Sequence, residues 1–301
     1  LSTNCLRFGS DACIFASIAT SGTFNNSAFM IVFPNAKINV GLRILNRRDD
    51  GYHNIESIMV PVKLADALEL TPSADGKFGF TSSGIEIEGD PGDNLCVKAF
   101  RLMQSRYQLP EVKIHLHKVI PAGAGLGGGS SDAAFTLRLL NRMFSLRLCN
   151  QELGSMAAEL GSDCTFFIEN RPALAGGRGE LLSHADFSLH GYQIAIVKPH
   201  FPISTAEAYS LVKPSGIGLP LPEIQGADPE KWKDLLINDF ELPVIEKWPE
   251  IGDLKQQFMD MGAFYASLSG SGSAVFGLFR SFPHALKDAF GDRFLWTGSA
   301  V

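Results

Sequence analysis

The sequence predicts an α+β protein built from two domains. Its 301 residues suffice for two domains, and 45% apolar against 19% charged residues is a globular balance that can fill sizeable cores. Predicted helices and strands follow each other in an order that does not repeat a strict βαβ pattern, which is typical of the α+β class. The turn Gly176-Gly177-Arg178-Gly179 marks a plausible boundary. We therefore expect domains at residues 30–180 and 181–301.

The overall charge and the cysteines argue against several classes of protein. A formal net charge of −6 does not attract nucleic acid or an anionic membrane, so an anionic substrate must meet local cations. The sequence has no run of about 18 apolar residues, which argues against a membrane span. Five scattered cysteines without a C-x-x-C pair argue against a disulfide framework or a zinc site. We expect a cytoplasmic protein with neither a nucleic-acid nor a membrane partner.

Residues 1–29 differ from the rest of the chain. They are rich in Ser, Thr, Asn and Ala, carry only Arg7 and Asp11 as charged residues, and show no amphipathic period. Met30 then opens a β pattern, so we expect Met30 to be the natural start and residues 1–29 to be a disordered upstream extension. A secretory signal or a transit peptide is the alternative, and the missing basic segment and the single arginine count against these.

Two strands open the first predicted domain. Residues 31–33 are apolar, and residues 37–45 alternate between apolar and polar side chains. Lys37 and Asn39, two residues apart, share the polar face. Such a face is usually solvated, and the alternative is the polar wall of a site.

A polar turn and a series of regular elements follow. Asp50-Gly51 marks the turn, and Tyr52 and His53 at its exit can stack on or hydrogen-bond a planar ligand. The apolar spacing predicts several strands and helices, the first helix being capped by Asp93 or Asn94. These elements are strands at residues 57–62, 67–71 and 112–119, and helices at residues 95–107, 133–146 and 151–160.

Asp163 stands where a helix ends and an apolar run begins. Gly161 is a good residue for the end of the preceding helix, and Phe166-Phe167-Ile168 follows shortly after the aspartate. The commoner role of such an aspartate is a helix cap or a turn. The alternative is a carboxylate that a rigid hydrophobic strand holds at the lip of a site.

The second predicted domain mixes short helices and strands. A loop of small residues followed by a strand lies within residues 268–278, and residues 214–226 form a Pro/Gly-rich linker. The same apolar patterns predict strands at residues 192–197, 263–267 and 294–297, and helices at residues 204–209, 229–237, 241–247, 254–261 and 282–290.

The segment from Pro121 to Asp132 is the strongest functional signal. Its five glycines fall within seven residues, and two serines and an aspartate follow at the start of the predicted helix. Glycines let the backbone approach a ligand closely, and backbone N–H groups at a helix N-terminus bind anions. The segment therefore predicts a phosphate-binding loop.

Three common phosphate-binding motifs do not fit this loop. Residues 123–128 match G-x-G-x-x-G, but the acid that a nicotinamide-dependent oxidoreductase needs about 20 residues later is missing. The chain contains no Gly-Lys-Ser/Thr, which excludes a P-loop. The H-R-D and D-F-G signatures of protein kinases are absent as well.

The glycine loop resembles the ATP-binding motif of the GHMP kinases. Further segments resemble the branch of that family that phosphorylates a cytidyl diphosphate sugar alcohol in the non-mevalonate isoprenoid pathway. The resemblance extends from about Met30 to the C-terminus and omits residues 1–29. It implies an N-terminal domain of the ribosomal protein S5 domain 2-like type and a C-terminal ferredoxin-like α/β sandwich. The segments that carry it are residues 34–40, 48–53, 121–134, 160–167 and 269–273.

This resemblance implies transfer of the γ-phosphoryl group of ATP to a tertiary 2-hydroxyl group. Asp163 would be the general base, and Lys37 would orient it or neutralise developing charge. Mg²⁺ would be held mainly by phosphate oxygens and water, with Ser130 or Ser131 nearby and no dedicated protein ligands. This chain departs from the motif at Cys164-Thr165, directly after the acid, where Val-Pro is common in the family. The implied nucleotide-binding residues are Pro121, Gly123, Gly125, Leu126, Gly127, Gly128, Gly129, Ser130 and Ser131.

The resemblance also assigns the cytidyl end of the substrate. His53 would contact the base edge, Tyr52 would stack on the base, and Tyr209 is a second stacking candidate. Asn39 would bind the erythritol hydroxyls or hold Lys37. The rival readings are a mevalonate- or homoserine-type kinase and a nucleotide-binding protein without catalysis. We expect a monomer or a weak homodimer.

Overall fold

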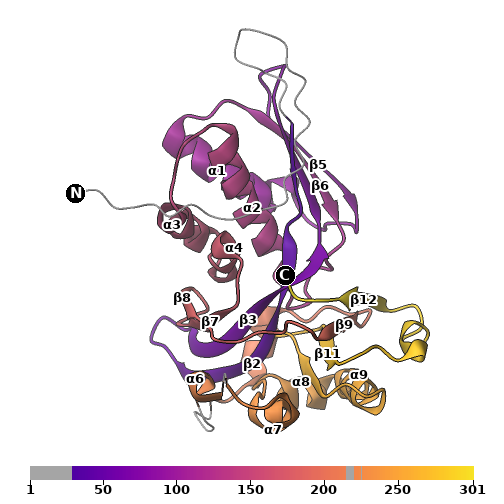
Figure 1. The fold of residues 1–301 in the computed structure, drawn as a ribbon. Coiled ribbons are helices and arrows are strands. Elements are labelled where there is room, and N and C mark those ends of the chain that lie inside the picture. The colour runs from indigo at the N-terminus through magenta and orange to yellow at the C-terminus, as the bar shows by residue number, and fades with distance from the viewer. Residues whose placement is uncertain (1–28, 215–219, 225) are drawn as a thin grey trace. The chain divides into compact units, whose positions relative to one another are not determined.

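The computed structural model describes residues 29–214, 220–224 and 226–301 (Figure 1). The described residues form two compact units, which we call the first and the second unit. The first unit contains the described residues up to Pro34, with Ala65–Val119 and Gly129–Glu169. The second contains Asn35–Leu64, Ile120–Gly128 and the described residues from Asn170 onward. The expectation for residues 1–28 lies outside the described residues.

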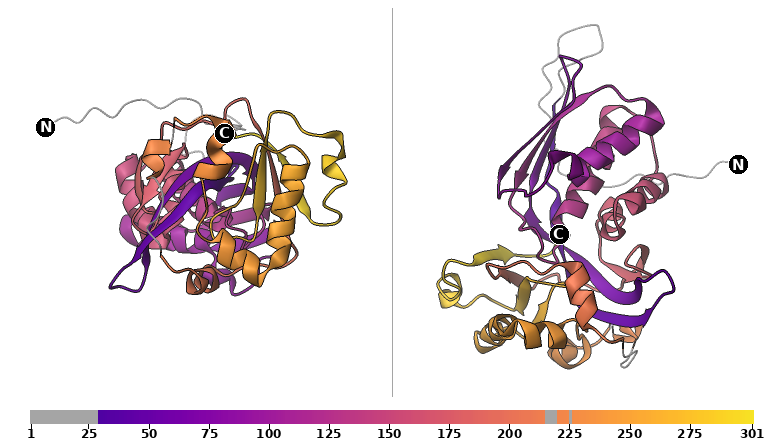
Figure 2. Two further views of the ribbon diagram at one scale, coloured as in Figure 1. Left: turned by 90° about the horizontal axis from the view of Figure 1, so that it is seen from below. Right: turned by 180° about the vertical axis from the view of Figure 1, so that it is seen from behind.

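The first unit is a sheet with helices on one face (Figures 1 and 2). Its strands are ordered β1-β4-β6-β5, with β5 and β6 parallel and the other pairs antiparallel. Residues in β6 are alternately buried and more exposed, as expected for a sheet covered on one face. The bounds are β1 (Met30–Val32), β4 (Ala67–Pro72), β5 (Gly79–Gly84), β6 (Val112–Lys118), α1 (Leu95–Tyr107), α2 (Gly128–Met143), α3 (Asn150–Leu160) and α4 (Phe166–Glu169).

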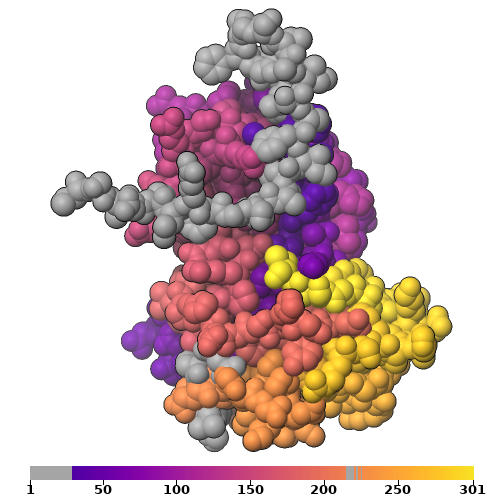
Figure 3. Space-filling view, viewed as in Figure 1, coloured from indigo at the N-terminus to yellow at the C-terminus, as the bar shows by residue number. Residues whose placement is uncertain are grey.

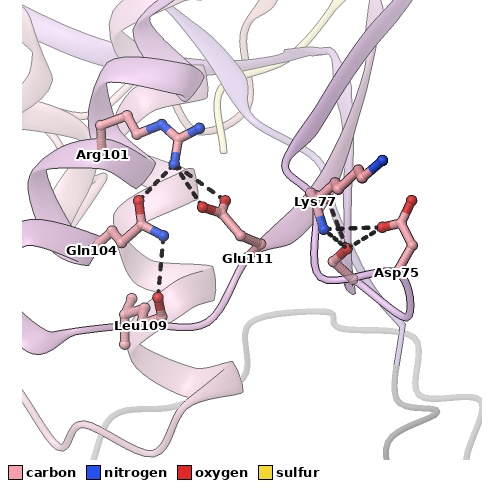
Figure 4. A network of polar contacts seen from close by, with 7 residues as sticks. Asp75, Lys77, Arg101, Gln104, Leu109 and Glu111 are labelled. Carbon is pink, nitrogen blue, oxygen red and sulfur yellow. Dashed lines mark hydrogen bonds and ion pairs between the residues drawn. The ribbon is translucent and has the colours of Figure 1, made fainter.

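Polar contacts fix α1 at its N-terminus and at its middle. The Asn94 side chain accepts a hydrogen bond from the backbone N–H of Cys96, which confirms the predicted cap. Arg101 Nη1 donates to Gln104 Oε1 at 2.6 Å and to Glu111 at 3.2 Å (Figure 4). Because Glu111 directly precedes β6, these bonds tie the helix to the sheet.

The second unit contains two sheets. The first has the order β2-β3-β7-β8, and its bounds are β2 (Asn35–Arg47), β3 (His53–Ala65), β7 (Ala173–Gly176) and β8 (Leu181–His184). The second is antiparallel with the order β12-β9-β11-β10, formed by β9 (Gln193–Lys198), β10 (Tyr265–Leu268), β11 (Val275–Phe279) and β12 (Phe294–Gly298). Numbered along the chain, this order is 4-1-3-2, which confirms the ferredoxin-like arrangement.

Helices cover one face of the second sheet (Figure 2). Phe258 on α9 is fully buried, and its ring lies where a side chain at Gly277 of β11 would stand, so helix and strand pack closely. The last residues, yellow in Figure 3, lie at the surface of this unit. The N–H of the exposed Val301 donates to the carbonyl of Pro61 at 3.0 Å. The helices are α5 (Thr205–Leu211), α6 (Leu221–Ile224), α7 (Trp232–Leu235), α8 (Glu241–Lys247) and α9 (Pro249–Asp260).

Two predictions next to the functional motifs are wrong. Helix α2 begins at Gly128 and not at Ala133, because burial of Ser131 and the buried ion pair of Asp132 with Lys118 override the low helix propensity of glycine. Residues 166–168 lie in the helix α4 and not in a strand. Phe166, Phe167 and Ile168 are all buried, and periodicity cannot separate a strand from a helix in so short an apolar run.

Several further boundaries also differ from the prediction. Residues 282–290 were predicted to form a helix but contain only a 3₁₀ turn, His284–Lys287. The prediction followed the helical spacing of Leu286 and Phe290, which are both buried although no α-helix forms. Residues 229–237 hold a 3₁₀ turn and the short α7, and α9 begins at Pro249, five residues before the prediction. The predicted linker contains α6 in its described part. Strands β7 and β8 were missed because each has only four residues and neither contains a β-branched or aromatic residue, which leaves little β signal.

Candidate active site

The glycine loop has the left-handed backbone that its composition predicts. Gly123, Gly125 and Gly127 have φ values of 60°, 72° and 69°. A Cβ atom at Gly125 would lie 1.8 Å from the carbonyl oxygen of Ser269, so this position must be glycine for packing reasons. Leu126 is buried, and its carbonyl accepts a hydrogen bond from the backbone N–H of Lys37 at 2.9 Å.

The loop runs directly into the first turn of α2. The first N–H groups of a helix lack intrahelical acceptors and carry the positive end of the helix dipole. Gly129 in this turn is exposed and Ser130 is partly exposed, so the turn is open to a ligand. Ser131 is buried, and its Oγ atom has no hydrogen-bond partner among the described residues. This turn has the donors that an anionic phosphate requires.

The second loop of small residues packs on the glycine loop. Ser269 Oγ donates to the carbonyl of Gly125 at 2.9 Å, and the backbone N–H of Ala274 donates to Ala124 at 3.1 Å. The N–H of Ser273 donates to Gly123 at 3.3 Å. Two loops about 145 residues apart in the chain are therefore joined by hydrogen bonds to their backbones.

Lys37 and Asn39 lie on a buried face of β2. Lys37 Nζ donates to Asn39 Oδ1 at 2.5 Å, Asn39 Nδ2 donates to Ser57 Oγ at 2.8 Å, and Ser57 Oγ donates to the Gly41 carbonyl at 2.8 Å. Lys37 is 3% exposed and Asn39 is 1% exposed. The solvated-face interpretation is therefore wrong. Ser57 was missed, and its only sequence signal is a polar residue in a largely apolar strand.

Tyr52, His53 and Tyr209 lie at the start of β3 and on α5. The rings of His53 and Tyr209 are stacked, with centroids 4.9 Å apart and 14° between the planes. Tyr52 is 57% exposed, and the guanidinium of Arg178 lies 4.8 Å from its ring centroid. Asp50 fixes the turn by accepting a hydrogen bond from the Tyr52 N–H at 3.1 Å. Arg178 was named only as part of a turn.

Burial sets the protonation state of His53. Partial burial lowers the pKa of His53 below its ordinary value, and the charge of Arg47 adds to this. The imidazole is therefore neutral at pH 7, with one ring nitrogen able to donate and the other able to accept a hydrogen bond.

Asp163 belongs to the 3₁₀ turn Ser162–Cys164 and is half-buried. The Cys164 thiol is buried, and burial raises the pKa of this thiol to about 11, while a hydrogen bond with Ser130 opposes the rise. That bond joins the turn of Asp163 to the first turn of α2. Asp163, the predicted base, is therefore the sequence neighbour of a residue that contacts Ser130 of the predicted phosphate site.

A buried charge cluster beneath the α2 turn was not predicted. Lys118 Nζ donates to Asp66 Oδ2 at 2.5 Å and to Asp132 Oδ2 at 2.9 Å, and the Val119 N–H donates to Asp66 Oδ1 at 2.6 Å. All three charged side chains are buried. Burial raises the pKa of Asp132 to about 8, the ammonium of Lys118 opposes this rise, and the charge of Asp66 adds to it.

The structure groups the predicted site residues by unit. Lys37, Asn39, Tyr52, His53, Tyr209 and the glycine loop as far as Gly128 belong to the second unit, whereas Gly129 to Asp132 and Asp163 belong to the first. In the part of the chain that the structure describes, no three His, Cys, Asp or Glu side chains form a metal-binding group. A search of the same residues finds no helix with the length and hydropathy of a membrane span.

Comparisons with known proteins point to one family. The model described as "GHMP kinases N terminal domain" matches residues 94–170, and "GHMP kinases C terminal" matches residues 221–291. A 4-diphosphocytidyl-2-C-methyl-D-erythritol kinase of Bacteroides fragilis is 50% identical over 252 residues, covering 83% of this chain and 92% of the relative. The Cytophaga hutchinsonii protein of the same name is 47% identical over 260 residues, covering 86% and 96%.

A solved structure agrees with these relatives. The crystal structure of a 4-(cytidine 5'-diphospho)-2C-methyl-D-erythritol kinase has a TM-score of 0.77 and 32% identity to this chain, and the match covers 90% of this chain and 99% of the other. The sequence of this chain thus predicted the same two-domain α+β fold that its relatives have.

Proposed function

The chain belongs to the 4-diphosphocytidyl-2-C-methyl-D-erythritol kinase family of the GHMP kinases, and we propose that it transfers the γ-phosphoryl group of ATP to the 2-hydroxyl group of 4-diphosphocytidyl-2-C-methyl-D-erythritol. The products are ADP and the 2-phosphate, an intermediate of non-mevalonate isoprenoid biosynthesis. The observation that carries the chemistry is the Ser130–Cys164 contact, which joins the turn of the Asp163 carboxylate to the open first turn of α2.

The chemistry of the glycine loop supports ATP as the phosphoryl donor. The left-handed glycines keep side chains away from the bound phosphates, and the first N–H groups of α2 supply hydrogen-bond donors. Ser131 Oγ, in the same turn, has no hydrogen-bond partner among the described residues. Mg²⁺ fits such a site, because it prefers oxygen ligands and retains water, and it would offset the phosphate charge when bound.

Asp163 is the residue that accepts the proton of the attacking hydroxyl group. A tertiary alcohol is a weak nucleophile, so a carboxylate must take its proton while the new O–P bond forms and the bond to the leaving β-phosphate breaks. The position of Asp163 on a 3₁₀ turn between α3 and α4 supports this role. A nucleotide-binding protein without catalysis would not need this carboxylate.

Lys37 supplies positive charge to the same reaction. Asn39 and Ser57 hold its ammonium group in one orientation, which lowers the reorganisation that the transition state requires.

Tyr52 is the better of the two stacking candidates for the cytosine ring. One face of the Tyr209 ring already stacks on His53, and the ring also makes a T-shaped contact with Phe240, with centroids 4.9 Å apart. Tyr52 is exposed, and Arg178 backs one of its faces. The neutral imidazole of His53 can hydrogen-bond the edge of the base.

We also propose that the protein is cytoplasmic. Cys96, Cys149 and Cys164 are free thiols, which supports a reducing cytoplasmic location. The small-molecule reaction needs no second chain, and we propose a monomer or a weak homodimer.

A substrate panel tests the proposed function. ADP release is measured with 4-diphosphocytidyl-2-C-methyl-D-erythritol, mevalonate and homoserine as acceptors. We expect kcat/KM to be at least about a hundredfold higher for the cytidyl substrate, because stacking and hydrogen bonding to a base are lost with the other two. Equal or higher activity with mevalonate or homoserine would show that the chain is another kind of GHMP kinase.

A further inference from the structure

Asn238, Asp239 and Glu241 form a polar brace between α7 and the start of α8. Asn238 and Glu241 are buried, and each of the three side chains accepts from or donates to the backbone of another segment. Buried polar groups are costly unless they are hydrogen-bonded, so two of them in four residues, with the partly buried Asp239 between them, need an explanation.

Asn238 holds the backbone that leads into the second small-residue loop. Its Nδ2 atom donates to the carbonyls of Leu268 and Gly270, each at 2.8 Å, and its Oδ1 atom accepts from the N–H of Phe240 at 3.0 Å. A neutral primary amide is the side-chain group that combines two donors on one atom with an acceptor. Asparagine therefore suits this position better than a carboxylate or an alcohol.

Glu241 holds the same backbone through the N–H of Leu268, whereas Asn238 holds it through the carbonyl. Its Oε1 atom accepts from Ser267 Oγ at 2.8 Å and from the N–H of Leu268 at 2.9 Å, and its Oε2 atom accepts from Lys255 Nζ at 2.5 Å. The N–H of Leu268 thus bonds to Glu241 and its carbonyl bonds to Asn238. The peptide units before and after Leu268 have little freedom left.

The brace is itself anchored on β2. Asp239 Oδ2 accepts from the N–H of Ile44 at 2.7 Å, and the backbone of Leu42 bonds to Ile237 and Asp239 at 2.9 and 2.8 Å. The brace therefore connects two parts of the second unit, the strand that carries Lys37 and the loop that begins at Ser269.

Movement of this loop would reach the glycine loop directly. Ser269 Oγ donates to the Gly125 carbonyl, and the Ser269 carbonyl lies where a Cβ atom at Gly125 would stand. The two loops thus touch without free space at Gly125, so a shift at Leu268 and Gly270 must displace the backbone of the glycine loop.

We propose that Asn238 and Glu241 are positioning residues for the ATP-binding loop. They fix Leu268 and Gly270, which fix Ser269 against Gly125, and so they hold the glycine loop in the shape that receives nucleotide phosphates. The proposal rests on the proposed function only in taking this loop as the nucleotide site. The expected consequence of losing the brace is weaker nucleotide binding beyond any general loss of stability.

The test compares two variants that replace one side chain by another of the same shape. Asn238→Asp places carboxylate oxygens where two carbonyl oxygens lie 2.8 Å away, so it repels the loop. We expect the Kd of ADP, measured by titration calorimetry, to rise about tenfold, or about 1.4 kcal/mol. In steady-state kinetics the KM for ATP should rise by a similar factor with a smaller change in kcat.

Asn141→Asp is the matched control. Asn141 on α2 holds the backbone of Leu148 through both its amide nitrogen and its oxygen, each at 3.0 Å, and these two hydrogen bonds go to neither small-residue loop. Both variants should lower the melting temperature, and only Asn238→Asp should weaken ADP binding. An ADP Kd for Asn238→Asp within a factor of two of the wild-type value would overturn the proposal.

A second pair of variants keeps the test decisive if Asn238→Asp does not fold. Glu241→Gln retains a carbonyl oxygen that can accept from Ser267 and Leu268, whereas Glu241→Leu retains none. We expect the glutamine variant to bind ADP within about threefold of wild type and the leucine variant to bind at least about tenfold more weakly. Equal affinities in both variants overturn the proposal. A wild-type chain that does not bind ADP overturns the proposed function as well, so the two failures are distinguishable.

Discussion

Replacing Asp132 by asparagine should change how the stability of the protein depends on pH. Asp132 and Asp66 share the single ammonium of Lys118, and all three side chains are buried. Asp66 receives hydrogen bonds from Lys118 and from the N–H of Val119, whereas Asp132 Oδ1 has no hydrogen-bond partner among the described residues. Asp66 is therefore the better stabilised carboxylate, and Asp132 is the group that takes up a proton.

The magnitude follows from the difference in pKa between the folded and the unfolded chain. Burial raises the pKa of Asp132 from its ordinary value of 3.8 to about 8 in the folded protein. The folded state therefore binds one more proton than the unfolded state between these two values. The free energy of unfolding should fall as pH rises through this window, by at most about 1.4 kcal/mol per pH unit.

Urea unfolding at pH 5, 6, 7 and 8 measures this slope. The nearby Cys96 thiol does not contribute, because burial raises its pKa and keeps it neutral. In Asp132→Asn this contribution is absent. The free energy of unfolding of the variant should therefore be close to that of the wild type at pH 5 and should rise relative to it with each further pH unit. Asp234→Asn, at an exposed aspartate of α7, serves as the control and should run parallel to the wild type. Parallel curves for Asp132→Asn and the wild type would refute the reasoning.

Three further predictions concern the proposed site. Asp163→Ala should lower kcat at least about a hundredfold and leave the ADP Kd within about twofold, as expected for a general base; turnover within a few-fold of wild type in a coupled assay would exclude that role. Gly125→Ala should lower the free energy of unfolding by more than about 2 kcal/mol in urea titrations, because the new Cβ would meet the Ser269 carbonyl. Gly191→Ala, with φ of 87° and nothing within 4 Å, measures the cost of the backbone conformation alone, and equal losses in the two variants would contradict this explanation. Tyr52→Leu should raise the KM for the cytidyl substrate about tenfold through lost stacking, while Tyr52→Phe should not; an unchanged KM in the leucine variant would assign the stacking elsewhere.

Local pattern was sufficient for the regular elements with strong periodicity. The alternation at residues 37–45 predicted β2, and the apolar spacing and Asn94 predicted α1 with its cap. Pattern failed where packing decides the conformation, as in α4, whose three consecutive buried residues fit either element, and at the start of α2. A run of three apolar residues or a run of glycines has no period from which to choose.

Family resemblance, rather than residue pattern, selected the candidate site residues. Pattern alone favoured a solvated face for Lys37 and Asn39, and the structure shows both to be buried in a hydrogen-bonded row. The stacked pair of His53 and Tyr209 joins residues from distant segments, and no local signal predicts such a pair. The assignment of Lys37, Asp163 and Tyr52 to their chemical roles stays a prediction until the variants are measured.

The sequence by itself determined the glycine loop, the family and most of the strands and long helices. These depend on local spacing, on glycines that allow positive φ, and on motifs that lie within a few residues of each other. Only the tertiary structure decided that the loop at Ser269 packs on Gly125, that Asn238 and Glu241 hold it, and that Asp66, Lys118 and Asp132 share one buried cluster. The physical reason is that burial and hydrogen bonding between distant segments depend on the packed chain, and the same asparagine or aspartate in a sequence is equally compatible with a solvated turn.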